Sequence, residues 1–229
     1  MYKYMCSMCL VLNMIKGIVF DLDGTLFATE YYQWQGWVVP LKKYGVELTK
    51  AKYFDYAGKT GGDIEKEIAR DFALSFKEGS LLKQKEKLLE KWFSTERIKL
   101  MPFAKEAVEY FNTNYKVGLC TGGPRDEALL KLERNDFLKY FESVTTLTDV
   151  ERGKPFPDIY EKAVQRLGLN VSECLALEDT QYGVRSAKDA GLYCFAIPNE
   201  YSRKQDFSRA DGVFQSLEEV VAFFEEGEC

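Results

Sequence analysis

A short apolar run that recurs along the chain and ends each time in polar residues is the feature that most constrains the fold. The first run, at 15–20, reads IKGIVF and continues into Asp-Leu-Asp-Gly-Thr. Comparable runs lie at 116–120, 143–146, 174–177 and 192–197, and the one at 143–146 is the weakest. Continuous apolar segments of this length are typical of parallel strands buried on both faces. We therefore predict a parallel sheet.

Helical patterns separate these runs. Pro124 lies near the first turn of one predicted helix, and Gly168 and Gly191 directly follow the last turns of two others, as is common at helix ends. Strand alternating with helix predicts an α/β fold, a Rossmann-like parallel sheet with helices on both faces. The predicted helices cover residues 102–112, 124–132, 157–167 and 181–190.

Residues 28–97 interrupt this alternation, because no segment there has the pattern of a strand. Apolar side chains at a spacing of four residues predict one helix stripe, a leucine-rich stripe at 81–93 predicts a second helix, and an aromatic cluster at 31–37 indicates an earlier one. The first stripe consists of Ile64, Ile68, Phe72 and Phe76.

This pattern predicts two domains. Residues 28–97 form an inserted helical cap, residues 1–27 and 98–229 form the core, and residues 1–14 are an extra tail. The chain has 229 residues, which is enough for one α/β domain and a small insertion.

Composition excludes several classes of chemistry. The chain has no histidine, so Ser-His-Asp and Cys-His mechanisms and the usual zinc ligand are excluded. Cys6 and Cys9 form a C-x-x-C with no second pair, and we interpret them as reduced bystanders. Cys120, Cys174 and Cys194 stand in apolar runs and are expected to be small core residues.

The net charge is −5 and no basic stripe is present, which argues against a nucleic-acid partner. The apolar stretch at 4–15 is shorter than the ~20 residues of a membrane-spanning helix and has no clear signal-peptide cleavage site. We therefore expect a cytoplasmic enzyme without a membrane partner, with Met1 or Met14 as its start. The sequence leaves a monomer and a homodimer equally open.

Polar residues collect where the predicted strands end. Asp21 and Asp23 follow the first strand, Thr121 follows the next, and Glu178-Asp179 follows another, while Lys154 lies in a loop. Ligands of open parallel sheets bind beyond the carboxyl ends of the strands. Several carboxylates in one crevice need a cation, and oxygen ligands suit Mg²⁺. A magnesium site with a lysine and a hydroxyl suits a phosphoryl group.

Each of these residues also has a structural explanation when taken alone. Asp-Gly is a common turn, Thr121 and the Glu178-Asp179 pair are suited to starting helices, and Lys154 suits a solvated surface position. Four such coincidences at strand ends are much less probable than one.

These motifs, in this order, resemble those of the haloacid dehalogenase-like (HAD) superfamily. The segments Lys154-Pro-Phe-Pro-Asp-Ile-Tyr and 177–191 closely resemble its phosphatase and β-phosphoglucomutase-like branch, and the resemblance covers about residues 15–215. It implies a Rossmann-like core with a helical cap inserted after the first motif. It also implies a Mg²⁺-dependent phosphatase that acts on a small phosphorylated metabolite through an aspartyl-phosphate.

The resemblance implies a role for each motif residue. Asp21 is the expected nucleophile and Asp23 the expected general acid and base. Thr121 is expected to bond a phosphoryl oxygen, and Lys154 to neutralise the phosphoryl group and Asp21. Mg²⁺ is expected to be held by the Asp21 carboxylate, the Asp23 backbone carbonyl and Asp179, with Glu178 in support.

Substrate contacts are a further hypothesis. We expect Gly122 and Gly123 to bring backbone amides to an anion. We also expect Lys59 and Thr60 to close over the site from the cap, and Arg125 to contact an anionic group of the substrate. Solvation at the surface explains Lys59, Thr60 and Arg125 equally well.

Two other functions stay open. A β-phosphoglucomutase-like mutase is one alternative, although the comparable stretch at 58–63 has glycine in the place where such mutases usually carry an arginine. A non-catalytic binding protein on a HAD scaffold is the other, although all four motifs are intact.

Overall fold

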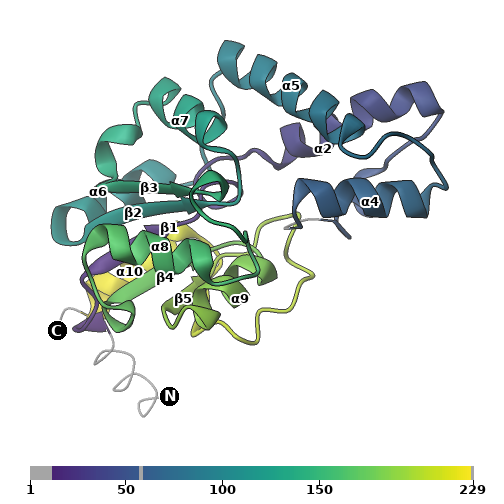
Figure 1. The fold of residues 1–229 in the computed structure, drawn as a ribbon. Coiled ribbons are helices and arrows are strands. Elements are labelled where there is room, and N and C mark those ends of the chain that lie inside the picture. Colours follow the sequence, from purple (N-terminus) through teal and green to yellow (C-terminus); the bar gives the residue numbers. More distant parts are fainter. Residues whose placement is uncertain (1–11, 57–58, 228–229) are drawn as a thin grey trace.

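The computed structural model describes residues 12–56 and 59–227. Six parallel strands form one sheet in the order β3-β2-β1-β4-β5-β6, with helices packed around it (Figure 1). This arrangement confirms the predicted Rossmann-like fold class. The strands are β1 (Gly17–Phe20), β2 (Lys116–Thr121), β3 (Ser143–Thr146), β4 (Cys174–Glu178), β5 (Tyr193–Ala196) and β6 (Gly212–Val213).

Alternation along β1 divides the core into two layers. Ile18 and Phe20 belong to one buried cluster and Val19 to another, because successive side chains of a strand point to opposite faces. The first cluster includes residues of α6 (Ala104–Asn114), α7 (Arg125–Arg134) and α10 (Leu217–Gly227). The second includes residues of α8 (Asp158–Leu167) and α9 (Gln181–Asp189). The sheet is therefore covered on both faces.

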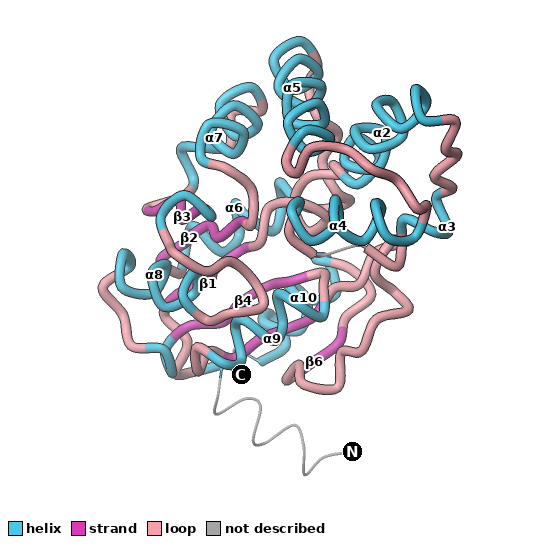
Figure 2. The backbone as a smooth tube through the Cα atoms, turned by 45° about the vertical axis from the view of Figure 1, so that its right-hand side comes forward, coloured by secondary structure: helices cyan, strands magenta, loops and turns pink. Residues whose placement is uncertain are grey.

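The described part of residues 28–97 contains helices and no strand. These helices gather beyond one end of the sheet in both views (Figure 2) and have a buried cluster of their own around Trp37, Ile64 and Leu81. They are α2 (Glu30–Leu41), α3 (Lys50–Tyr53), α4 (Gly61–Asp71) and α5 (Ser80–Thr95).

The two chain segments that lead into and out of this helical region lie side by side. The Ala28 amide donates to the Lys99 carbonyl at 2.8 Å, and the Met101 amide donates to the Leu26 carbonyl at 2.9 Å. Phe27 and Leu100 form an antiparallel bridge between them. The helical region is thus attached through one paired connection.

Short 3₁₀ helices connect several of these elements. They lie at Lys42–Tyr44, Leu138–Tyr140, Leu147–Asp149 and Val171–Glu173.

Several details differ from the sequence-based expectations. The apolar stripe at 64–76 is only half helical, because α4 ends at Asp71 and Ala73 adopts a left-handed φ of 51°. Phe72 and Phe76 nevertheless pack on the same cluster. β6 and α10 were not predicted: β6 has only two residues, and the helical pattern of α10 was overlooked.

The N-terminal segment and the cysteines complete the comparison. Leu12 is buried in the first cluster, so at least one residue of the predicted tail packs on the core. Residues 1–11, with Cys6 and Cys9, lie outside the described residues. Cys120, Cys174 and Cys194 are free and buried, as expected. Among the described helices, none combines the length and the apolarity that crossing a membrane requires.

Candidate active site

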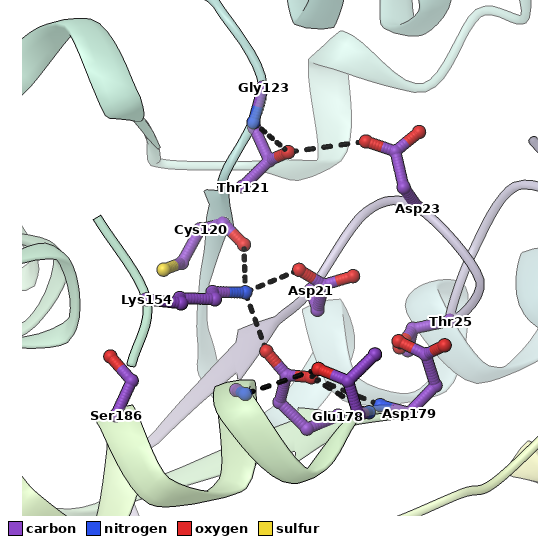
Figure 3. Close-up of polar contacts among 12 residues, drawn as sticks. Asp21, Asp23, Thr25, Cys120, Thr121, Gly123, Lys154, Glu178, Asp179 and Ser186 are labelled. Carbon is purple, nitrogen blue, oxygen red and sulfur yellow. Dashed lines mark hydrogen bonds and ion pairs between the residues drawn. The ribbon is translucent and has the colours of Figure 1, made fainter. Parts of the chain in front are cut away.

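The predicted motif residues meet at the carboxyl edge of the sheet. Asp21 follows β1, Thr121 is the last residue of β2, and Glu178 is the last residue of β4. Because these three strands are parallel neighbours, their ends bring the side chains together. Lys154 reaches the same place from the loop before α8 (Figure 3).

Lys154 links two of the carboxylates. Its Nζ lies 2.5 Å from Asp21 Oδ1 and 2.5 Å from Glu178 Oε1, and it donates to the Cys120 carbonyl at 3.4 Å. The lysine side chain is only 9% exposed. Although burial opposes its charge, Asp21 and Glu178 hold the pKa of Lys154 well above its usual value. The alternative of a solvated surface lysine is therefore wrong.

Three buried carboxylates lie together at this place, and two of them contact the lysine. Asp21, Glu178 and Asp179 each offer an oxygen, and these oxygens lie within 4.8 Å of one another. Burial raises the pKa of Asp21 to about 7 against the opposing effect of Lys154. Burial, together with the Asp21 charge, also raises the pKa of Asp179 well above its usual value. One lysine does not compensate three carboxylates, so the cluster has the character of a site for a hard divalent cation.

Within the described residues, Glu178 accepts more hydrogen bonds from protein donors than Asp21 or Asp179 does. Oε1 accepts from Lys154 and, at 2.8 Å, from the Tyr160 hydroxyl, while Oε2 accepts from the amides of Asp179 and Thr180. Gly183 lies directly against this carboxylate, since a Cβ at that position would stand 1.9 Å from the Glu178 carboxyl carbon. The first turn of α9 thus requires glycine and fixes the Glu178 side chain.

Asp23 lies apart from this cluster. Its carboxylate points toward Thr121 and away from the Asp21 carboxylate (Figure 3). Oδ1 accepts from Thr29 Oγ1 at 2.7 Å and from Lys131 Nζ at 2.5 Å, and Oδ2 accepts from Thr121 Oγ1 at 3.3 Å. Burial opposes ionisation, yet Lys131 and these hydrogen bonds hold the pKa of Asp23 below its usual value.

A cavity of about 450 Å³ opens in front of these residues and is lined by both the sheet edge and the helical region. Of the predicted substrate contacts, Lys59, Thr60, Gly122 and Gly123 line it. Lys59 Nζ is also paired with Glu67 at 2.7 Å.

Arg125 is placed elsewhere. It is not among the residues that line this cavity; its side chain is 44% exposed and contacts Asp149 and the Val144 carbonyl instead.

Sequence reasoning missed several residues of the site. Lys131 on α7 is buried although it is a lysine, and the available signal was its place beside Ala128 and Leu132 on the apolar stripe of that helix. Asn199 donates to Asp179 Oδ2 at 2.7 Å and to the Gly24 carbonyl at 3.2 Å. No sequence signal pointed to it.

Two further missed residues, Glu30 and Lys85, line the cavity. Burial raises the pKa of Glu30 to about 8 and lowers the pKa of Lys85. Neither belongs to one of the four motifs.

Comparison with known proteins identifies the family of this chain. The sequence profile of the haloacid dehalogenase-like hydrolase family matches residues 18–197, and the chain therefore belongs to that family. It is similar to the phosphorylated carbohydrates phosphatase of Thermotoga maritima, with 31% identity over 93% of this chain and 92% of the relative. It is also similar to the validoxylamine A 7′-phosphate phosphatase of Streptomyces hygroscopicus subsp. limoneus, with 28% identity over 90% and 96%.

Solved structures agree with this placement. The crystal structure of CbbY from Rhodobacter sphaeroides in complex with phosphate has a TM-score of 0.78 and 25% identity, and the match covers 92% of this chain and 99% of that one. The resemblance, the fold class and the enzyme class expected from the sequence are thereby confirmed: the chain is a hydrolase of the phosphatase type.

Proposed function

We propose that this protein is a Mg²⁺-dependent phosphatase that hydrolyses a small phosphorylated metabolite through a phospho-enzyme on Asp21. The observation that carries the proposal is the buried contact of Lys154 with Asp21 and Glu178, of which Lys154 and Asp21 line the cavity. A carboxylate beside a buried lysine and further carboxylates is suited to receiving a phosphoryl group once its charge is compensated.

Magnesium fits the donor set of this site. The Asp21 carboxylate, Asp179 and the Asp23 backbone carbonyl would hold the ion, while Glu178, whose oxygens accept from protein donors, orients its neighbours. When bound, the ion supplies positive charge to the carboxylates and to the phosphoryl oxygens.

The protein groups then divide the work of two steps. In the first, Asp21 attacks phosphorus, the bond from phosphorus to the leaving oxygen breaks, and Asp23 in its acid form gives a proton to that oxygen. In the second, water attacks phosphorus, its proton passes to the Asp23 carboxylate, and the bond from phosphorus to Asp21 breaks. Inorganic phosphate leaves and Asp21 is regenerated. Lys154 and Thr121 hold the phosphoryl oxygens in both steps.

Substrate choice is assigned to the cavity walls. We infer that residues 28–97 act as a cap over a core made of 1–27 and 98–229, because Lys59 and Thr60 line the same cavity as Gly122 and Gly123. The relatives named for carbohydrate and validoxylamine phosphates support a phosphorylated sugar or sugar-like alcohol as substrate. Arg125 stays a predicted contact that this placement does not favour.

The test is phosphate release from a panel of hexose phosphates, pentose phosphates, phosphoglycolate and nucleoside monophosphates. We expect turnover with Mg²⁺, no turnover in excess EDTA, and recovery when Mg²⁺ is restored. Asp21→Asn should abolish turnover while the protein stays folded, and Asp126→Asn, which changes an exposed carboxylate, is the matched control. Steady turnover by Asp21→Asn, or full activity after exhaustive chelation, contradicts the proposal. A cytoplasmic location and a monomeric or homodimeric state remain predictions for fractionation and light scattering.

A further inference from the structure

Lys131 is a buried cation that has no role in the two proposed steps of the reaction. It lies on α7, its side chain is 1% exposed, and its Nζ stands 5.1 Å from the centre of the Phe93 ring. Taking a lysine out of water is unfavourable unless it is paired. Its partners are two carboxylates, Asp23 at 2.5 Å and Glu127 at 2.9 Å.

The two oxygens of Asp23 have unequal surroundings. Oδ1 receives both the Lys131 ammonium and the Thr29 hydroxyl, at 2.5 and 2.7 Å. Within the described chain, the donor to Oδ2 is the Thr121 hydroxyl at 3.3 Å, which is a long contact for an O–H donor. Oδ2 also lies close to Gly123, where an added Cβ would stand 3.9 Å from it, and Thr121 and Gly123 both line the cavity. Oδ1 is therefore held by Lys131 and Thr29, and Oδ2 lies toward the segment that the proposed function assigns to the phosphoryl group.

We propose that Lys131 is a positioning residue that anchors Oδ1 of Asp23 and so leaves Oδ2 as the oxygen that exchanges protons during phosphoryl transfer. This inference rests on the proposed function. In the first step the proton on Oδ2 passes to the leaving oxygen as its bond to phosphorus breaks. In the second step Oδ2 takes the proton of the attacking water. Lys131 keeps all of its own protons in both steps.

Leaving groups of different basicity separate this role from a merely structural one. p-Nitrophenolate leaves phosphorus without needing a proton, whereas a sugar alkoxide needs one. Losing the orientation of the acid should therefore slow an alkyl phosphate far more than p-nitrophenyl phosphate. General acid catalysis contributes roughly 10²–10⁴-fold, so partial loss of it is easy to measure.

The experiment compares kcat/KM for glucose 6-phosphate with kcat/KM for p-nitrophenyl phosphate in the wild type and in Lys131→Met. This parameter reports the steps up to release of the leaving group, whereas hydrolysis of the phospho-enzyme is common to both substrates. If glucose 6-phosphate is not turned over, the alkyl phosphate of highest kcat/KM in the panel takes its place. We expect the ratio of the two kcat/KM values to fall by about tenfold or more. In an Asp23→Asn background, Lys131→Met should leave the ratio where Asp23→Asn alone puts it, because the lysine acts through Asp23.

Two further variants make the result decisive. Thr29→Val removes the other donor to Oδ1 while keeping size and charge, so it should shift the ratio in the same direction even if Lys131→Met fails to fold. Lys105→Met, which changes an exposed lysine on α6, should leave the ratio unchanged.

The possible failures are distinguishable. Equal losses on both substrates, or an unchanged ratio in Lys131→Met and Thr29→Val, overturn the role of Lys131 and leave the phosphatase intact. A wild type that releases phosphate from nothing in the panel overturns the proposed function, and the positioning role falls with it.

Discussion

Replacing Lys154 by methionine should destabilise the metal-free protein strongly. Methionine keeps most of the length of the side chain and removes its charge together with its N–H donors. Asp21 and Glu178 then lose the ammonium that lies 2.5 Å from each of them, and both carboxylates stay buried. The cluster with Asp179 becomes three carboxylates without a protein cation inside hydrogen-bond distance of Asp21.

The magnitude follows from burial. Removing one partner of a buried ion pair costs about 3–5 kcal/mol, because the remaining charge keeps its desolvation cost and loses its compensation. For a chain of this size, each kcal/mol lowers the melting temperature by about 2–4 °C, so the expected fall is roughly 6–20 °C. Added Mg²⁺ should recover part of the loss, because it binds the folded state.

Thermal unfolding in EDTA, followed by circular dichroism, measures the effect. Lys16→Met is the matched control: the Lys16–Glu173 ion pair has the same 2.5 Å length, but the lysine is 63% exposed. An exposed pair contributes about 0–1 kcal/mol, so this variant should melt within a few degrees of the wild type. Equal shifts for Lys154→Met and Lys16→Met would refute the argument that burial sets the cost.

Two other predictions concern the same cluster. Gly183→Ala should lower kcat/KM by about 100-fold. The new Cβ displaces the Glu178 carboxylate, and a displacement of about 1 Å near the reacting groups has an effect of that size. Kinetics like those of the wild type would contradict this prediction and show that α9 can move aside. In EDTA, the free energy of unfolding should fall as pH rises from 5 to 8. Burial raises the pKa of Asp21 to about 7 and that of Glu30 to about 8, so the folded state keeps protons that the unfolded state releases. Glu30→Gln should flatten this slope in urea titrations, and a stability that rises over the same range would contradict the reasoning.

The sequence was sufficient for the parts of the site that are local. Asp21 directly follows an apolar strand, and Thr121 and Glu178 are each the last residue of one. Parallel strands bring their carboxyl ends to one edge by geometry alone. The apolar run of a strand and the polar residue at its end are both visible in a single stretch of the sequence. That is why the sheet and the edge where these residues meet were predictable without a structure.

Residues whose role depends on distant partners were not predictable in this way. Lys131 contacts Asp23 across more than one hundred residues of sequence, and Asn199 reaches Asp179 and Gly24 from a loop without a motif. Nothing in the local composition around Asn199 separates it from a solvated side chain, and the local signal for Lys131 was only its place on the apolar stripe of α7. The predicted extent of the helix at 64–76 was wrong for a related reason. Phe72 and Phe76 pack on the same buried cluster as the helix, but they lie beyond its last residue.

The paired connection between Leu26 and Met101 has a consequence for protein engineering. Since the chain leaves the sheet region and returns to it at neighbouring points, the gap that a deletion of the intervening helices would leave is short enough for a brief turn to close. Asp21, Thr121, Lys154 and Asp179 all lie outside the deleted stretch. A minimal version of the protein would thus retain the proposed reactive groups while losing the helical region to which we assign the choice of substrate, and other helical regions could be inserted at the same two points.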